Sequence, residues 1–145
     1  MRVVLLSVVL FAAGVFVGAQ NTGAGTVYVD AAKVAAAIAK GGNLVSAPDV
    51  TVLGAHREAA GQVEGHDKET DVIYMIEGDA TFVTGGKMVG GKQSRPNQWI
   101  GSDITGGESR SLHKGDIIVV PAGTPHWFKQ VPKSVNYFVV KALKP

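Results

Sequence analysis

The chain has 145 residues, of which 46% are hydrophobic, 19 are glycine and none is cysteine. This length and composition are typical of one compact domain with many turns, and the lack of cysteine excludes a disulfide-stabilised scaffold. The net charge is only +2, and the basic residues are scattered among acidic ones. The sequence therefore gives no electrostatic reason to expect a nucleic-acid partner.

Residues 1–19 are predicted to be a secretory signal peptide. Arg2 supplies one positive charge, residues 3–17 are almost entirely apolar, and Val17-Gly18-Ala19 offers the small residues that a signal peptidase accepts. An uncleaved membrane anchor is the alternative, but the apolar run is short for a membrane span and lacks strong anchoring flanks. We therefore expect an exported protein, periplasmic or secreted, that is cleaved near Ala19 and has no stable membrane anchor.

Residues 20–42 are predicted to form a linker and a short helix. A glycine- and threonine-rich stretch is followed by Val27-Tyr28-Val29, which is a candidate short strand. Asp30 has the side chain of a helix N-cap, the alanine-rich residues 31–40 favour a helix, and Gly41-Gly42 would end it.

Residues 43–145 carry the pattern of short strands separated by turns. Glycine or proline stands between most of the candidates, as in a small β-sandwich or barrel. The candidate strands are residues 44–47, 50–57, 63–66, 72–77, 80–84, 109–113, 117–120, 126–131 and 135–142. Residues 85–107 interrupt this pattern and are long for a loop. They are expected to be either a lid or binding loop, or a surface excursion held in place by Trp99.

The stretch from Gly115 to His126 places a rigid turn directly before a histidine. Pro121 and Pro125 fix φ, and Gly123 can adopt positive φ, so the backbone leading into His126 is strongly determined. We infer that the direction of the His126 side chain matters. A part-buried histidine that merely ends a hairpin is the alternative if His126 acts alone.

A second polar stretch, from Glu64 to Gly78, holds candidate partners for His126. Glu64 and His66 are two residues apart, so in a strand their side chains leave the same face. A turn of four residues then leads to Asp71, and a hairpin would bring these three side chains together. If His126 arrives from a neighbouring strand, two imidazoles and one or two carboxylates converge. Such a donor set suits Fe(II), Mn(II), Zn(II), Ni(II) or Co(II) and leaves open positions for water or substrate.

These two stretches resemble the two motifs of the cupin superfamily. The second motif is G-x5-P-x-G-x2-H-x3-N, and its positions are filled here by Gly115, Pro121, Gly123, His126 and, in place of asparagine, Gln130. The first motif is G-x5-H-x-H-x3,4-E-x6-G, of which the chain carries a degenerate version. Its positions hold Glu58 in place of the leading glycine, then Glu64, His66, Asp71 and Gly78. The resemblance covers roughly residues 50–140.

The resemblance implies an all-β fold, an antiparallel β-sandwich or barrel of the double-stranded β-helix type, with a short N-terminal helix and a pocket inside. The chain is similar to small secreted bacterial mono-cupins. Carried over by position, His66 and His126 would bind a divalent metal ion, Glu64 would replace a histidine ligand, and Asp71 would replace the glutamate. Asp71 is one methylene shorter than glutamate and could reach the metal through water, and Glu64 favours harder cations. A cupin scaffold that has lost its metal is the alternative.

Two functions fit these residues. The first is a metal-dependent oxygenase, isomerase, decarboxylase or lyase that acts on a small oxygen-rich molecule such as a carboxylate, an enediol or a sugar derivative, with Glu64 or Asp71 as general base if unliganded. The second is a non-catalytic module that binds a sugar or a small acid. In both, the partner is a small molecule in the barrel. Cupins commonly pair through sheet faces or swapped N-terminal strands, so the resemblance also allows a homodimer.

Overall fold

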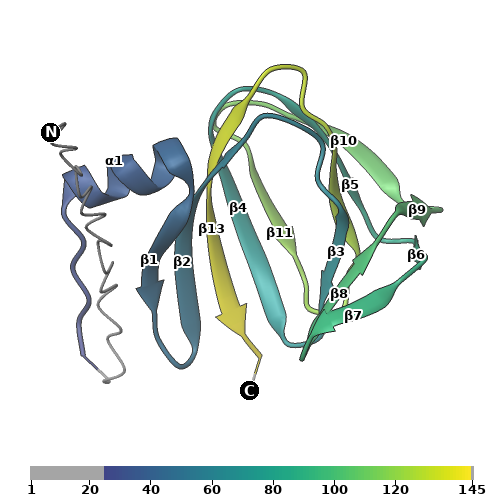
Figure 1. Cartoon of the computed structure of the whole chain (residues 1–145), viewed down its shortest axis with the longest axis horizontal. Coiled ribbons are helices and arrows are strands. Elements are labelled where there is room, and N and C mark those ends of the chain that lie inside the picture. Colours follow the sequence, from purple (N-terminus) through teal and green to yellow (C-terminus); the bar gives the residue numbers. More distant parts are fainter. Residues whose placement is uncertain (1–24, 145) are drawn as a thin grey trace, which may run out of the picture.

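The structure is a computed structural model that describes residues 25–144, so the predicted signal peptide lies outside the described residues. Within residues 25–144, no helix is long and apolar enough to cross a membrane. The chain forms two antiparallel β-sheets that face each other, with one short helix beside them (Figure 1). The all-β sandwich with an N-terminal helix that the sequence predicts is confirmed.

The first sheet has five strands in the order β1-β2-β13-β4-β11, the second has six in the order β10-β5-β12-β3-β8-β7, and β6 pairs separately with β9. The elements are α1 (Ala31–Lys40), β1 (Gly42–Ser46), β2 (Val50–Arg57), β3 (Val63–His66), β4 (Glu69–Glu77), β5 (Ala80–Thr84), β6 (Lys87–Val89), β7 (Lys92–Arg95), β8 (Gln98–Gly101), β9 (Asp103–Thr105), β10 (Glu108–Leu112), β11 (Ile117–Val120), β12 (His126–Gln130) and β13 (Val135–Leu143).

The core lies between the two sheets because side chains alternate between the faces of each strand. In β4, Ile73 and Met75 are buried and Tyr74 between them is exposed, and in β13 the alternate residues Tyr137 and Val139 are buried. The other members of this hydrophobic cluster are Ala80, Phe82, Leu112, Val120, Phe128 and Val135. The same alternation carries polar side chains of β4 and β13 into the space between the sheets.

The helix α1 packs on the outer face of the first sheet, over β2. Its N-cap is Asp30, as predicted, because the Asp30 carboxylate accepts a hydrogen bond from the helix backbone at 3.0 Å. Leu53 and Ala55 pack against the core, so Gly54 between them faces outward. A Cβ at Gly54 would lie 2.6 Å from the carbonyl carbon of the buried Ala37. Glycine at this position therefore allows the close approach of helix and sheet.

Two predicted elements differ from the structure. Val27-Tyr28-Val29 is not a strand. Residues 85–107 are not a loop but contain four short strands, β6 to β9, of which β8 pairs with β3 in the second sheet. Trp99 holds this segment in place, since its indole N–H donates to the Asp67 carboxylate at 3.0 and 3.1 Å. The glycines that suggested a loop instead form the tight turns between these strands, as at Gly90 with φ 62°.

The strands β3 and β4 do not form the predicted hairpin. The first belongs to the six-stranded sheet and the second to the five-stranded sheet, so the chain crosses from one sheet to the other between them. The connection is Asp67-Lys68 rather than four residues, and β4 begins at Glu69. Asp71 therefore faces Glu64 and His66 from the opposite wall of the sandwich.

Candidate metal and ligand site

A cavity of about 270 Å³ lies between the two sheets. This volume is near the lower end for ligand pockets and suits a small molecule. Part of the wall is apolar, from residues such as Leu53, Ile73 and Val139. The polar residues of the wall are Arg57, Gln62, Glu64, His66, Asp71, Arg95, Gln98, His126 and Lys141. All four residues that the sequence predicts as ligands therefore line one cavity.

The backbone brings the two histidines together from neighbouring strands. β12 pairs antiparallel with β3, and His126 lies opposite Glu64 in this register. The turn before His126 is tied to the other histidine, because the N–H of Gly123 donates to the carbonyl of His66 at 2.7 Å. Gly123 has a φ of 80°, which favours glycine. The rigid turn therefore sets the position of His126 relative to His66.

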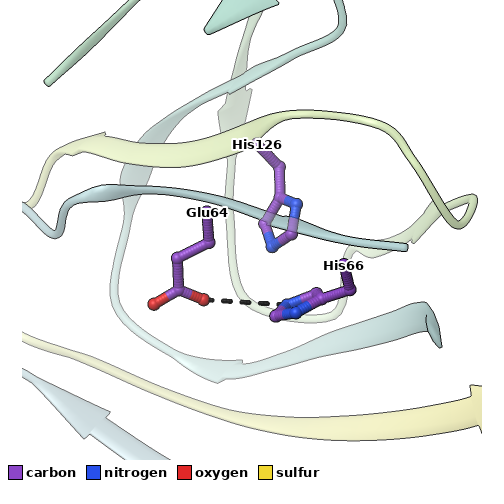
Figure 2. A group of neighbouring side chains, drawn as sticks. All are labelled: Glu64, His66 and His126. Carbon is purple, nitrogen blue, oxygen red and sulfur yellow. Dashed lines mark ion pairs between the residues drawn. The ribbon is translucent and has the colours of Figure 1, made fainter. Parts of the chain in front are cut away.

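Glu64, His66 and His126, which all line the cavity, converge on one another (Figure 2). Each offers one ligand atom, and the three atoms lie within 4.8 Å of one another. Both histidines are buried, with 4% and 6% of their surface exposed, whereas Glu64 is only partly covered. We call these three residues the triad.

Hydrogen bonding sets the tautomer of His126. Its Nδ1 lies 3.1 Å from the carbonyl oxygen of Thr124, which can only accept, so Nδ1 carries the hydrogen and Nε2 keeps its lone pair. Burial lowers the pKa of His126, and this effect outweighs the Thr124 contact and the charge of Asp71, which raise it. The ring is therefore neutral at pH 7, which is the form that binds a metal.

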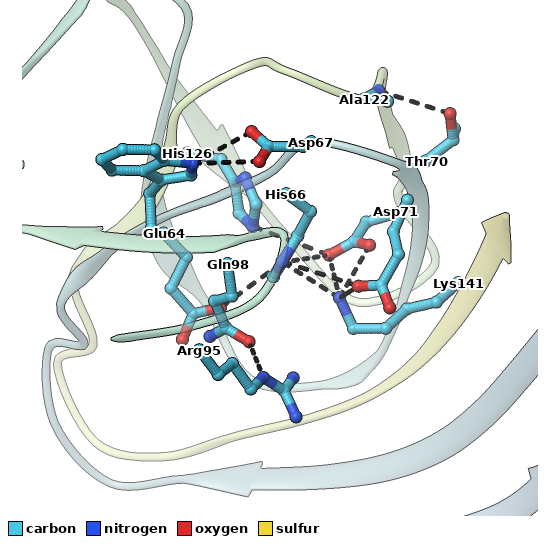
Figure 3. A network of polar contacts seen from close by, with 12 residues as sticks. Glu64, His66, Asp67, Thr70, Asp71, Arg95, Gln98, Ala122, His126 and Lys141 are labelled. Carbon is cyan, nitrogen blue, oxygen red and sulfur yellow. Dashed lines mark hydrogen bonds and ion pairs between the residues drawn. The ribbon is translucent and has the colours of Figure 1, made fainter. Parts of the chain in front are cut away.

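A second polar cluster is centred on Lys141, which sequence reasoning missed (Figure 3). The Lys141 ammonium donates to both carboxylate oxygens of Asp71 at 2.8 and 2.9 Å. It also lies 3.2 Å from Glu69 Oε2 and 3.0 Å from Nε2 of His66. We call these four residues the lysine cluster.

The pairing of β13 with β4 explains why Lys141 enters the cavity. The register sets Lys141 directly opposite Asp71. The inward row of β13 runs through Val135, Tyr137 and Val139, and two residues further along the same face is Lys141. A lysine that continues a row of alternating buried residues is the sequence signal that could have identified it.

Asp71 is the predicted ligand whose carboxylate lies beside the triad but is already occupied by Lys141. It lies 3.4 Å from Nε2 of His66 and 3.6 Å from Nε2 of His126, but Lys141 already binds both of its oxygens. Burial raises the pKa of Asp71, but the charge and the hydrogen bonds of Lys141 act against burial, and the pKa is lowered overall. Asp71 is therefore ionised at neutral pH and serves first as the counter-ion of Lys141.

His66 belongs to both the triad and the lysine cluster. An ammonium can only donate, so Nε2 of His66 accepts from Lys141 and Nδ1 carries the ring hydrogen. That Nδ1 is buried without a hydrogen-bond partner in the described part of the chain, 3.5 Å from Oε2 of Glu69. The Nε2 lone pair that accepts from Lys141 is the one that a metal at the triad would need. Lys141 and a metal ion therefore compete for His66.

The triad nevertheless has the donor set of a divalent metal site. Two neutral imidazoles and one carboxylate bind Fe(II), Mn(II) or Zn(II) and leave further coordination positions free. The buried His126 supplies an Nε2 lone pair that the Thr124 contact keeps unprotonated. The residues present therefore fit such an ion, with Glu64, His66 and His126 as the group that would hold it.

The other two histidines of the chain are outside this site. His56 contacts Asn136 at 2.6 Å and Glu58 at 3.2 Å, and it does not line the cavity. His113 is exposed and pairs with Asp79 at 2.8 Å. They provide matched histidine controls for the triad.

Two facing antiparallel sheets, with buried imidazoles and acids around an inner cavity, are the architecture of a small β-sandwich with an internal pocket. The sequence identifies the family, because the family model described as Cupin matches residues 55–144. The chain belongs to the cupin family. Among curated proteins, no sequence matches this chain.

Several solved structures have a similar fold. A protein from Bacillus halodurans is 14% identical, with a TM-score of 0.51, and the match covers 71% of this chain and 69% of that one. A cupin protein from Bacteroides fragilis is 11% identical, with a TM-score of 0.46 and 66% of each chain covered. Oxalate decarboxylase from Bacillus subtilis is 18% identical, with a TM-score of 0.47, and the match covers 66% of this chain but only 21% of that one. Likeness at these identities concerns the fold and not the activity.

Proposed function

We propose that this chain is an exported cupin that holds a divalent metal ion at Glu64, His66 and His126 and acts as an enzyme on a small oxygen-rich molecule in its cavity. One observation carries the proposal: three ligand atoms lie within 4.8 Å of one another, and two of them belong to buried imidazoles. A bound divalent ion would polarise a carbonyl or carboxylate oxygen of the molecule. Export rests on the signal-peptide pattern of residues 1–19.

The residues beside the triad would bind the molecule and handle its protons. Lys141, held by Asp71 and Glu69, is an ammonium donor at the wall of the cavity. Of the two carboxylates that line the cavity, Asp71 is bound by Lys141 and Glu64 is not. Glu64 is therefore the carboxylate that would accept a proton from the molecule in the form of the site where it is not bound to the metal.

A non-catalytic binding module is the second candidate, and Lys141 is the observation that favours it. Its ammonium forms ion pairs with Asp71 and Glu69 and uses the lone pair of His66 without any metal. In this case the cavity would bind a sugar or a small acid through hydrogen bonds and ion pairs alone. The two candidates differ in metal content.

The metal content of the full chain, purified without chelators, tests the proposal. We expect close to one Fe, Mn, Zn, Ni or Co ion per chain, together with turnover of a small oxygen-rich substrate. His126→Ala should lower the metal content at least about tenfold with the fold retained, because it removes one of three ligands. His113→Ala is the matched control and should leave the metal content unchanged, since His113 is exposed and outside the cavity.

Two results would contradict the metal-dependent enzyme. Protein that is metal-free and gains no thermal stability from added Mn(II), Fe(II), Zn(II) or Ni(II) supports the binding module. Equal metal content in the wild type and His126→Ala rejects the triad as the metal site.

A further inference from the structure

Arg57 forms a cationic region of the cavity separate from the lysine cluster. It is the last residue of β2, and it shares the inward face of that strand with Leu53 and Ala55. Its guanidinium carbon lies 5.2 Å from the centroid of the Phe128 ring. This cation–π contact places the guanidinium beside Phe128 in the wall of the cavity.

The turn after β2 is shaped to hold this guanidinium. A Cβ at Gly61 would lie 2.5 Å from Nη1 of Arg57, so the glycine leaves the space that the guanidinium uses. The Gly61 backbone is fixed to β12, because its N–H donates to the Phe128 carbonyl at 3.0 Å and its carbonyl accepts from the Trp127 indole at 2.6 Å. Arg57 is therefore held by a glycine and an aromatic ring that are themselves fixed in place.

The positive charge of Arg57 has no counter-charge among residues 25–144. None of the ion pairs formed within residues 25–144 includes Arg57. Its Nε is also buried without a hydrogen-bond partner in that part of the chain. Lys141, in the same cavity, contacts two carboxylates. A buried cationic donor without an acceptor is unfavourable, so we expect the acceptor to enter from the cavity.

We propose that Arg57 binds a carboxylate group of the ligand, so that the substrate class is a small organic acid. This proposal rests on the proposed function in that it takes the cavity as the ligand site. A planar guanidinium donates two parallel hydrogen bonds to a carboxylate or a phosphate. A carboxylate is favoured at Arg57 because Glu64 and Asp71 line the same cavity and repel a doubly charged phosphate group more strongly than a singly charged carboxylate group.

The spacing along β12 indicates what the rest of the acid would contact. Phe128, which packs under Arg57, and His126 of the triad are two residues apart on the same face of the strand. This separation is about 7 Å. A short acid with its carboxylate at Arg57 would therefore extend a second oxygen toward His126, as a hydroxy acid, a keto acid or a dicarboxylate can.

Calorimetric titration of the full chain tests the proposal, with succinate and its neutral analogue succinamide as probes. The measurement is made on protein as purified and again after metal removal. We expect the wild type to bind succinate at least about tenfold more tightly than succinamide. Arg57→Met should bring this ratio of affinities to one. Arg57→Lys keeps the charge but loses the planar fork, and should retain only part of the ratio. Gly61→Ala keeps Arg57 but displaces it, and should also reduce the ratio.

Arg110→Met is the matched control. Arg110 is not among the residues that line the cavity and it pairs with Glu108, so we expect the preference for succinate to persist in this variant. The proposal is overturned if the wild type does not prefer succinate over succinamide, including if it binds neither. It is also overturned if inorganic phosphate binds more tightly than succinate, or if Arg57→Lys and Gly61→Ala both keep the full ratio. The metal content of the same proteins separates a failure of the metal site from a failure of this proposal.

Discussion

The triad and the lysine cluster share His66, but they differ in whether a cationic side chain pairs with their acidic residues. In the lysine cluster one ammonium meets the carboxylates of Asp71 and Glu69, so the acids have a cation. In the triad, Glu64 converges with two imidazoles, of which His126 is neutral. The difference shows that the acids of the lysine cluster are paired with a cationic side chain of the protein, whereas the triad has the donors of a cation site and includes no lysine or arginine.

Removing the Asp71 carboxylate from the lysine cluster should have the largest effect on stability. Asp71→Ala leaves Lys141 with only Glu69 as an acidic partner, so we expect unfolding free energy to fall by about 3 kcal/mol in denaturant titration. Asp79→Ala is the control. It removes an exposed partner of His113 and should change the unfolding free energy by less than about 1 kcal/mol. A similarly small loss in Asp71→Ala would show that the lysine cluster behaves like a surface ion pair.

A change outside both clusters should separate stability from metal binding. Gly54→Ala places a Cβ 2.6 Å from the backbone of Ala37, so helix and sheet must move apart. We expect a loss of about 1–3 kcal/mol in denaturant unfolding, with unchanged metal content. Gly42→Ala is the control, because its Cβ would have no atom closer than 3.7 Å. Loss of metal in Gly54→Ala would show that the site depends on the packing of α1.

Competition between Lys141 and the metal for His66 predicts a gain of affinity. Lys141→Met frees Nε2 of His66 and both oxygens of Asp71, so we expect Zn(II) to bind about tenfold more tightly in competition with a fluorescent chelator. Lys33→Met is the control, because Lys33 forms an exposed ion pair with Asp30 at 3.0 Å. Unchanged or weaker binding in Lys141→Met would show that Lys141 does not oppose the metal.

The pH dependence of stability should show the smallest effect. The pKa of His126 is lowered from 6.5 by burial, so below pH 6.5 the unfolded chain binds more protons than the folded one. In metal-free protein, the unfolding temperature should therefore fall as pH drops below 6.5. The lowered pKa of Asp71 adds a second loss of stability, which begins as the pH falls through 3.8.

The variant His126→Gln isolates the first of these phases. Glutamine does not titrate, so this variant should lose the decline that begins at pH 6.5 and keep the one that begins near 3.8. An unfolding temperature that rises on mild acidification, or a first decline that persists in His126→Gln, would contradict the burial of a neutral imidazole.

The strand bounds and turns that depend on the local spacing of residues are the features that the sequence predicts best. Strands β2, β3, β5 and β11 have the predicted bounds because turn residues and alternating hydrophobic residues mark them. The approach of His126 to His66 follows from a turn whose proline and glycine residues define its shape. By contrast, the glycines within residues 85–107 are compatible with a loop or with tight turns between short strands, so local spacing could not distinguish these.

The remaining parts of the site depend on long-range pairing. Lys141 lies 70 residues from Asp71 in sequence, and only the register of β13 against β4 places them together. Asp71 itself is close to His66 in sequence but belongs to the other sheet, so proximity along the chain suggested a hairpin that does not form. Sequence alone therefore predicted Asp71 as a ligand without its competing partner.

Anomalous diffraction from crystals grown with Mn(II) tests the metal site most directly. We predict an anomalous peak among Glu64, His66 and His126, about 2.0–2.3 Å from their ligand atoms, with Asp71 still bound to Lys141. A peak at another place would contradict the triad as the metal site. A triad without a peak at saturating Mn(II), with Lys141 still on Nε2 of His66, would contradict it as well.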